Sequence, residues 1–372
     1  MKLLLTISRI LTGLVFTFSG FVKAVDPVGT QIKFGDYFEA MGLDFLIPAT
    51  LIFSIILNAA ELVVGIALLI NLLPKISSWG ALAFMVLFTP LTLWLAVANP
   101  VTDCGCFGDA IKLTNWETFG KNVILLILAL TLFLNREKLT SRYSIKKSRI
   151  QLIIIIIAVL SFQFTNLTSL PLIDFRPFKK GVNIREATLI PKDAKKDIYE
   201  TALFYKNLKT GEKKKFNMDN IPYEDTLTWE YDTTITELIS KGYEPPIHDF
   251  FLTDLNGNDR TELILSNIKT SYILILHNFA EGVKKIDISI EEIAQYAKDN
   301  KINFFCFTSS GNKEIIKYKD FLPANIIVCT GDYKMLKTFA RTNPSFVILE
   351  NAVIKEKVAF KKAKKIYKNK TK

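Results

Sequence analysis

The chain has 372 residues, 49% of them hydrophobic, and a formal net charge of +11. Its length predicts two or three domains, and its composition fits a protein that is half membrane and half soluble. The positive charge does not indicate nucleic-acid binding, because the lysines are scattered and gather mainly in residues 361–372, without an aromatic-interleaved basic stripe. We expect a solvated basic tail with some affinity for anionic membrane lipid, and no nucleic-acid partner.

Apolar residues dominate the chain up to about residue 170. A helix needs about 20 such residues to cross the hydrocarbon core of a membrane. Five segments qualify: Leu3–Val25, Phe45–Leu73, Trp79–Ala98, Phe119–Leu134 and Ile150–Leu167. We expect the first to be a span rather than a signal peptide, because Arg9 and Lys23 interrupt it and no small-x-small cleavage site follows. The fold class predicted for this half is an α-helical transmembrane bundle of about five spans.

Midway along the second segment stands one carboxylate, Glu61. A charged group at membrane depth is costly and normally faces the bundle interior, a polar partner or a cavity. Two interpretations stay open. Glu61 serves a proton relay or contacts a bound head group, or it makes a structural hydrogen bond to Arg9 or Lys23 of the first segment.

The loop between the fourth and fifth segments, residues 136–149, is strongly basic. Against the single acid Glu137 it carries Arg136, Lys138, Arg142, Lys146, Lys147 and Arg149. By the positive-inside rule this loop is cytoplasmic. The amino terminus then lies inside, while loops 26–44 and 99–115 and the soluble domain lie outside. For a bacterial protein we expect the inner (cytoplasmic) membrane, with the soluble domain in the periplasm.

The outer loop 99–115 contains the sequence DCGCFGD at residues 103–109. Two cysteines two positions apart can form a disulfide only if the chain bends sharply, and Gly105 permits the bend because it has no Cβ. Such a small ring suits a labile exchange disulfide, and disulfides persist in an oxidising outer compartment. The loop also lies near the head-group boundary, where a quinone ring could approach.

A metal site is the other chemical option for this loop. Only two thiols and two carboxylates are near, and the histidines, His248 and His277, lie far along the chain, so we predict no zinc site. The structural alternative is a glycine-rich turn whose thiols pack at the interface. We favour Cys104 and Cys106 as a redox pair.

The opening RILTGLVFTFSGFVKAVDP, Glu61 and the DCGCFGD loop together resemble the DoxX/MauE family of small membrane proteins. The resemblance covers roughly residues 1–135, a four-helix membrane domain, and the CGCFG string is its most specific part. MauE-type members are linked to maturation of a disulfide-rich periplasmic enzyme subunit, and DoxX relatives to quinone-coupled sulfur oxidation. The resemblance implies that Cys104 and Cys106 are the exchange pair and leaves the substrate open.

Beyond residue 135 three further regions follow. Residues 136–170 form the basic loop and the fifth helix, and residues 171–243 form a Pro- and Lys-rich tether with a mixed polar segment. In the latter, residues 202–218 (ALFYKNLKTGEKKKFNM) predict a hairpin that turns at Thr210-Gly211. Residues 244–372 form an α/β domain with a Lys-rich tail.

Strands and helices alternate in this last region and close on a hairpin. The expected strands are 271–278, 302–310 and 326–331, the helices 289–300, 312–321 and 333–341, and the hairpin 345–360, with turns at 256–257 and 351–352. Residues 244–365 resemble the TlpA-like branch of the thioredoxin-like proteins. The resemblance implies that Asn343 and Pro344 occupy the cis-proline position, which lines the groove where client chains dock.

The resemblance fails where that family carries its redox motif. Two cysteines should follow the strand 271–278, at the start of a helix whose amino terminus lowers the thiol pKa. Residues 279–283 are instead FAEGV, so we expect no dithiol chemistry there. Cys306 and Cys329 lie inside predicted strands and are expected to be buried, with pairing left open if the strands are neighbours. We expect His248 and His277 to be structural.

Two functions follow from these observations. The first is a membrane thiol–disulfide redox factor, in which Cys104 and Cys106 exchange electrons with a periplasmic client protein or a quinone. The second is a non-enzymatic envelope scaffold that uses the cysteine-free domain for docking. A carrier that uses Glu61 has little support, because five spans without internal repeats are not typical of transporters.

Overall fold

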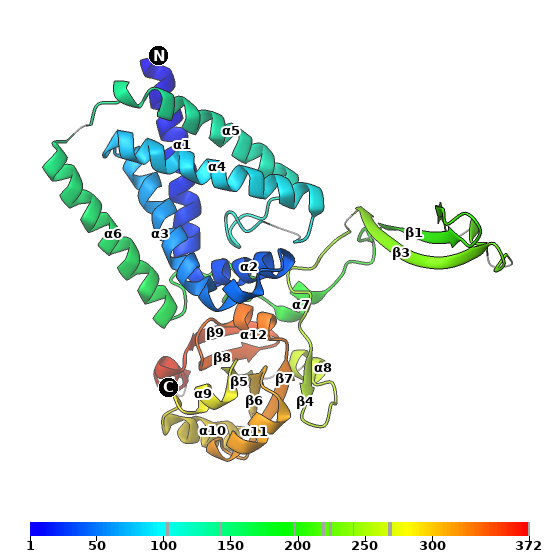
Figure 1. Ribbon diagram of the computed structural model, residues 1–372. Coiled ribbons are helices and arrows are strands. Elements are labelled where there is room, and N and C mark those ends of the chain that lie inside the picture. The colour runs from blue at the N-terminus through cyan, green and yellow to red at the C-terminus, as the bar shows by residue number, and fades with distance from the viewer. Residues whose placement is uncertain are drawn as a thin grey trace. The chain divides into compact units, whose positions relative to one another are not determined.

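The computed structural model describes residues 1–101, 104–141, 143–196, 198–217, 220–222, 225–240, 242–266 and 270–370 (Figure 1). Arg142, Asp103 and Lys372, which entered the predictions above, lie outside these residues. The chain divides into two compact units. One comprises Met1–Asn183 and Asp249–Lys372, and the other comprises Ile184–His248.

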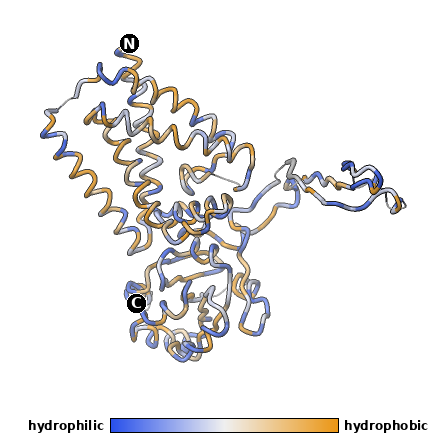
Figure 2. Tube along the Cα trace, in the orientation of Figure 1, coloured by the Kyte–Doolittle hydropathy of each residue, from blue (hydrophilic) through white to orange (hydrophobic). Residues whose placement is uncertain are grey.

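Within the described residues of the first unit, five helices are long and apolar enough to cross a membrane, as predicted. They are α1 (Lys2–Val25), α3 (Thr50–Leu69) with the preceding 3₁₀ helix η1 (Asp44–Ala49), α4 (Pro74–Ala98), α5 (Asn115–Leu134) and α6 (Ile145–Thr168). Their outward-facing side chains are apolar, and Figure 2 shows the hydrophobic colouring along these helices. This region fits a multi-pass membrane protein.

Two of these helices begin several residues before their apolar runs. Thr114 and Glu117 form a capping box: the Glu117 amide donates to Thr114 Oγ1 over 3.2 Å, and the Thr114 amide donates to Glu117 Oε2 over 2.8 Å. Helix α5 therefore starts four residues before the predicted Phe119. Likewise, α4 begins at Pro74, which needs no amide hydrogen at the first helical position.

Helices α1 and α3 form the closest pair of the bundle. A Cβ on Gly65 of α3 would lie 2.4 Å from the backbone nitrogen of Thr17, so only glycine allows this approach. Helix α6 joins them through two amide side chains. Gln163 Nε2 donates to the Ile55 carbonyl over 3.2 Å, and Asn166 Nδ2 donates to the Ala24 carbonyl over 3.3 Å.

The segment after α1, expected as a loop, contains a further helix, α2 (Pro27–Ala40). Asp26 caps it by accepting a hydrogen bond from the Gly29 amide over 3.2 Å, and Pro27 occupies its first turn. Ser54 Oγ of α3 donates to the Pro27 carbonyl over 2.6 Å, which ties α2 to the bundle.

Residues 249–370 form a six-stranded sheet in the order β4-β7-β6-β5-β8-β9. The strands are β4 (Leu252–Asp254), β5 (Thr270–Leu276), β6 (Asn303–Thr308), β7 (Ile326–Gly331), β8 (Ser345–Glu350) and β9 (Val353–Ala359). The pairs β5–β6 and β6–β7 are parallel, and the other pairs are antiparallel. The C-terminal region is thus α/β, as predicted, and β8 and β9 form the expected hairpin with positive φ at Asn351 and Ala352.

Short helices accompany this sheet. They are α8 (Thr261–Leu265), α9 (Phe279–Val283), α10 (Ser289–Asp299), α11 (Asn312–Tyr318) with η4 (Lys319–Phe321), α12 (Tyr333–Phe339), η5 (Phe360–Lys362) and α13 (Ala363–Lys370). Part of the lysine-rich end packs on the α/β domain, while Lys361, Lys362, Lys364 and Lys365 are exposed. Ala363 is fully buried, Tyr367 packs on the core, and Lys364 Nζ lies 2.9 Å from Glu292 Oε1.

The residues after α6 are held on the α/β domain rather than forming a free tether. Arg176 is buried and donates to Asp174 Oδ1 over 2.7 Å and to the Thr338 carbonyl over 3.2 Å. The Gly181 amide donates to the carbonyl of Ile354 in β9 over 2.8 Å. The start of the predicted tether is therefore part of the first compact unit.

Cys306 and Cys329 are buried, unpaired thiols on neighbouring strands. Cys306 is opposite Val328 and Cys329 is opposite Phe307, one position along. Because neighbouring residues of a strand project to opposite faces, the two thiols lie on opposite sides of the sheet. The register therefore prevents the disulfide that the sequence left open.

The second unit contains a three-stranded antiparallel sheet in the order β2-β1-β3, with a short helix α7 (Ile184–Thr188). The strands are β1 (Ile198–Asn207), β2 (Lys213–Phe216) and β3 (Trp229–Ser240). The β1–β2 hairpin agrees with the prediction, and Gly211 in its turn has a φ of +74°.

Candidate functional site

The Cys-Gly-Cys sequence lies in the loop that joins α4 to α5 and closes a disulfide. The Cα atoms of Cys104 and Cys106 are 5.5 Å apart, and Gly105 between them has a φ of +63°. This left-handed conformation is the bend that such a short ring needs, and glycine adopts it without strain. All three residues are half-buried, so the disulfide is partly accessible to solvent.

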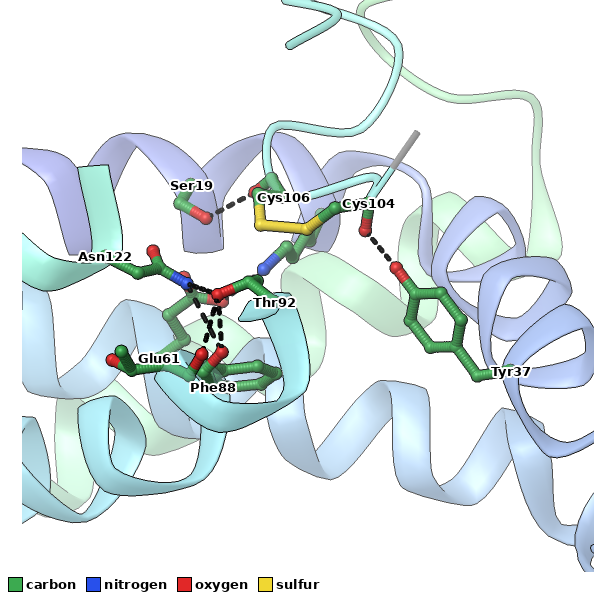
Figure 3. Close-up of a disulfide and its surroundings, with 10 residues drawn as sticks. Ser19, Tyr37, Glu61, Phe88, Thr92, Cys104, Cys106 and Asn122 are labelled. Carbon is green, nitrogen blue, oxygen red and sulfur yellow. Dashed lines mark hydrogen bonds and ion pairs between the residues drawn. A yellow bond between two sulfur atoms is a disulfide. The ribbon is translucent and has the colours of Figure 1, made fainter. Parts of the chain in front are cut away.

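Two hydrogen bonds hold the backbone on either side of the disulfide (Figure 3). Ser19 Oγ of α1 donates to the Cys106 carbonyl over 2.6 Å. The Tyr37 hydroxyl of α2 donates to the Cys104 carbonyl. The loop is therefore fixed between two helices that are far from it in the sequence.

Phe107 anchors the loop from the next position. Its side chain is buried, with its ring centroid 5.5 Å from that of Phe18 in α1. Lys121 Nζ of α5 lies 4.5 Å from the same centroid, in a cation–π contact.

Near the end of the loop, the carboxyl group of Asp109 has a shifted pKa. Burial raises its pKa above the usual range, and the attraction of Arg341 opposes this shift without cancelling it. The pKa of Asp26 is changed in the other direction. Burial alone would raise it, but the charge and hydrogen bonds of Arg341 outweigh burial and lower it.

Glu61 pairs with Lys23 rather than with Arg9. Lys23 Nζ lies 2.8 Å from Glu61 Oε2, and both side chains are buried. Arg9 instead donates to the carbonyls of Leu68 and Leu69, at the carboxyl end of α3, with a distance of 2.9 Å to Leu69. Cations suit this end of a helix because its last carbonyls lack helical partners.

More polar side chains surround Glu61 inside the bundle. Figure 3 shows Glu61, Thr92 and Asn122 grouped to one side of the disulfide. Asn122 Nδ2 donates to Thr92 Oγ1 over 3.1 Å. Among the described residues, the hydroxyls of Thr89 and Thr118 are buried without a hydrogen-bond partner. The bundle thus encloses a polar patch at the depth of the Lys23–Glu61 ion pair.

Asn343 and Pro344 are joined by a cis peptide bond just before β8. Asn343 Nδ2 donates over 3.0 Å to the carbonyl of Asn278, the residue that caps α9. Whether a client chain docks beside these two residues is a prediction that stays open. They do not share a hydrogen bond with the disulfide loop among the contacts of the described residues.

Helix α9 stands where the resemblance placed a dithiol motif, and its first amides are already engaged. The Phe279 amide donates to Ser310 Oγ, the Ala280 amide to Glu314 Oε1 and the Glu281 amide to Asn278 Oδ1, over 2.8 to 3.0 Å. Residues 279–283 contain no cysteine. This end of α9 therefore offers neither a thiol nor free amides to stabilise one.

The two histidines lie in different surroundings. His277 is buried, its Nε2 contacts the Ala340 carbonyl, and burial lowers its pKa to about 3. His248 is half-exposed, 3.5 Å from Glu244. Among the described residues, no three His, Cys, Asp or Glu side chains are grouped as metal ligands would be.

Sequence reasoning missed α2 and the two side chains that it brings to the loop, Lys33 and Tyr37. The signals present were the Asp26-Pro27 capping pair and the aromatic and aliphatic residues between Ile32 and Phe38. The two glycines inside the segment, Gly29 and Gly35, obscured its helical character.

Comparison with known families separates the regions of the chain. Residues 1–135, from α1 to the end of α5, match the model of the family described as methylamine utilisation protein MauE. Residues 199–241, which hold the three-stranded sheet, match a domain of unknown function, DUF8463. No curated protein matches the chain, and no solved structure does. The membrane region of this protein is therefore MauE-like.

Proposed function

We propose that the protein is a membrane thiol–disulfide redox factor and that Cys104 and Cys106 are its exchange pair. The observation that carries the proposal is the half-exposed disulfide, clamped at both carbonyls by Ser19 and Tyr37. Labile, functional disulfides are accessible and close small loops, whereas structural ones are shielded. The MauE-like membrane region supports a redox-related process.

The disulfide in the structure is the oxidant, so the balanced exchange starts from a client dithiol. A client thiolate attacks Cys104 Sγ, the bond to Cys106 breaks, and Cys106 leaves as a thiolate that takes up a proton. The second client thiolate then attacks the client sulfur of the mixed disulfide, which forms the client disulfide and releases Cys104 as a thiolate. Two electrons pass from the client to the pair, and the reverse reaction, from the reduced pair, reduces a client disulfide.

A quinone was the acceptor suggested by the sequence, and this stays a prediction. An apolar groove of about 430 Å³ lies between α3, α4 and α6. Its lining includes neither Cys104, Cys106 nor any other residue of their loop. A quinone in this groove would not meet the disulfide, so no step of the proposed exchange passes through one.

The α/β domain would hold the client. Its parallel strands β5–β7 and the antiparallel pair β8–β9 support a thioredoxin-like arrangement without its cysteines. A domain of this kind can bind an extended chain and leave the chemistry to the membrane loop. This division of labour is part of the proposal.

The orientation proposed is the one expected from charge. The basic loop 136–149 would be cytoplasmic, and the disulfide loop and α/β domain would be periplasmic, at the bacterial inner membrane. The client would then be a periplasmic protein, in a compartment that maintains disulfides.

The exchange is tested by trapping in cells. In Cys106→Ser, the resolving thiol is missing, so we expect mixed disulfides through Cys104 on non-reducing gels, lost on reduction. The matched control Cys104→Ser/Cys106→Ser should give no adducts. Absence of adducts in the single variant, together with full complementation by the double variant, would eliminate the redox function and favour a non-enzymatic scaffold.

A further inference from the structure

Lys33 of α2 lies across the bend of the disulfide loop. A Cβ built on Gly105 would stand 3.0 Å from Lys33 Cγ, 3.4 Å from Cδ and 3.5 Å from Cε. The lysine side chain therefore runs along the face of the turn between the two cysteines. Its ammonium nitrogen is one bond of about 1.5 Å beyond Cε, so the charge stays near the turn.

Helix α2 fixes the position from which this side chain projects. Lys33 and Tyr37 are four residues apart and so share one face of the helix. Tyr37 hydrogen-bonds the Cys104 carbonyl from this face, and Ser54 ties the start of the helix to α3. The cation is therefore presented to the loop by an element that is anchored at both ends.

We infer that Lys33 stabilises the thiolate of the reduced Cys104–Cys106 pair, an inference that rests on the proposed function. The thiolate is the reacting form of cysteine, and a neighbouring ammonium group lowers the thiol pKa by favouring the charged state. When the disulfide opens, the developing negative charge would face the Lys33 ammonium group. The fraction of reactive thiolate near neutral pH rises as a result.

Other ionisable groups surround the loop and belong in the interpretation of any pH profile. They include Lys23 of α1, Tyr37 of α2, Glu61 of α3, Lys121 of α5, Asp109 and Lys112 of the loop itself, and Asp26 and Arg341, whose charges act on Asp109. Lys23 is neutralised by Glu61 at 2.8 Å, and Lys121 lies over the ring of Phe107. The side chain of Lys33 lies beside Gly105, where an added Cβ would come 3.0 Å from its Cγ.

The test measures the thiol pKa directly. Full-length Cys106→Ser protein in detergent micelles keeps Cys104 as its reactive thiol, and its alkylation by iodoacetamide is followed by mass across pH 5–10. In this background we expect Lys33→Met to raise the pKa of Cys104 and slow alkylation at pH 7 by about three- to tenfold. Lys33→Arg, which keeps the charge, should restore the rate.

Controls separate charge from packing. Lys112→Met removes a cation from the same loop and should have a smaller effect than Lys33→Met. An unchanged profile in Lys33→Met, or a Lys33→Arg protein as slow as Lys33→Met, would overturn the inference. Where Lys33→Met does not fold, Lys33→Gln supplies the same comparison. Mixed disulfides without a pKa change would refute only the role of Lys33, whereas a pKa change without mixed disulfides would refute only the client exchange.

Discussion

Lys23 Nζ of α1 lies 2.8 Å from Glu61 Oε2 of α3, and both side chains are buried among transmembrane helices. Each charge offsets the cost of burying the other, so removal of one partner leaves an uncompensated charge. We expect Lys23→Met alone to destabilise the protein by about 3–5 kcal/mol. Thermal unfolding in detergent micelles measures the effect.

A double-mutant cycle shows whether the pair acts as a unit. Lys23→Met/Glu61→Gln removes both charges and should cost less than the sum of the single variants, because no charge is left unpaired. Additive losses would mean that the two side chains stabilise the bundle independently.

Buried Arg341 and half-buried Asp26 make a second ion pair, with Arg341 Nη2 at 2.7 Å from Asp26 Oδ2. It joins the α/β domain to the residue that caps α2. Replacing Arg341 by Met leaves the carboxylate unpaired and should destabilise the protein by about 3 kcal/mol at neutral pH. The exposed pair Lys334–Asp36 is the matched control, and Lys334→Met should cost less than about 1 kcal/mol.

This pair also predicts a dependence on pH. The pKa of Asp26 is lowered in the folded state because Arg341 outweighs burial. A lowered carboxyl pKa contributes stability above the unfolded value, and that stability is lost as pH falls through the folded value. The difference in melting temperature between the unmodified protein and Arg341→Met should therefore shrink in acid. A difference that grows in acid would contradict the assignment.

We expect the buried cysteines, Cys306 and Cys329, not to react with thiol-labelling reagents in the folded protein. Burial raises the pKa of Cys329 to about 12 and that of Cys306 well above its usual range, so thiolate is scarce at pH 8. After mild reduction, we expect two labelled thiols in the folded protein and four after denaturation. The double variant Cys104→Ser/Cys106→Ser should give no labelled thiol in the folded protein and two after denaturation.

Because Cys306 and Cys329 do not react in the folded protein, thiol labelling also reports on which side of the membrane the disulfide loop lies. In intact cells treated with a membrane-impermeant reductant and then an impermeant maleimide, Cys104 and Cys106 should react. Labelling that appears only after the membrane is permeabilised would reverse the proposed topology.

Gly105 gives a further prediction. An alanine there would hold a φ of +63° and place its Cβ 3.0 Å from Lys33 Cγ. We expect Gly105→Ala to cost about 1–2 kcal/mol and to slow re-formation of the disulfide by oxidised glutathione. Gly35→Ala in α2 meets no atom within 4 Å and should leave the closure rate unchanged. Equal rates of disulfide closure in the unmodified protein, Gly105→Ala and Gly35→Ala would show that the bend does not require glycine.

The five membrane helices could be predicted because length and hydropathy alone decide them. The partner of Glu61 could not be chosen, although Arg9 and Lys23 are about 21 Å apart along a helix and cannot both reach it. The choice depends on how far α1 is shifted along α3, which is set by contacts such as Gly65 against Thr17. The hydropathy pattern of the sequence does not determine how far α1 is shifted along α3.

Other differences have similar causes. The presence of Cys306 and Cys329 on strands was predictable, but their opposite faces follow from the strand register. Helix α2 was missed because Gly29 and Gly35 obscure its helical pattern, and because the hydrogen bond from Ser54 that ties it to α3 joins residues far apart in the sequence. The disulfide loop was found from the sequence, whereas Lys33 and Tyr37 around it were not.

The contacts of Ser19 and Tyr37 end on main-chain carbonyls and not on sulfur. Opening the disulfide therefore breaks neither of them, and the peptide backbone can keep its course while the two sulfur atoms change oxidation state. The neighbouring helices α1 and α2 set the shape of the loop. Little reorganisation is then required in either direction, which suits a bond that is made and broken repeatedly.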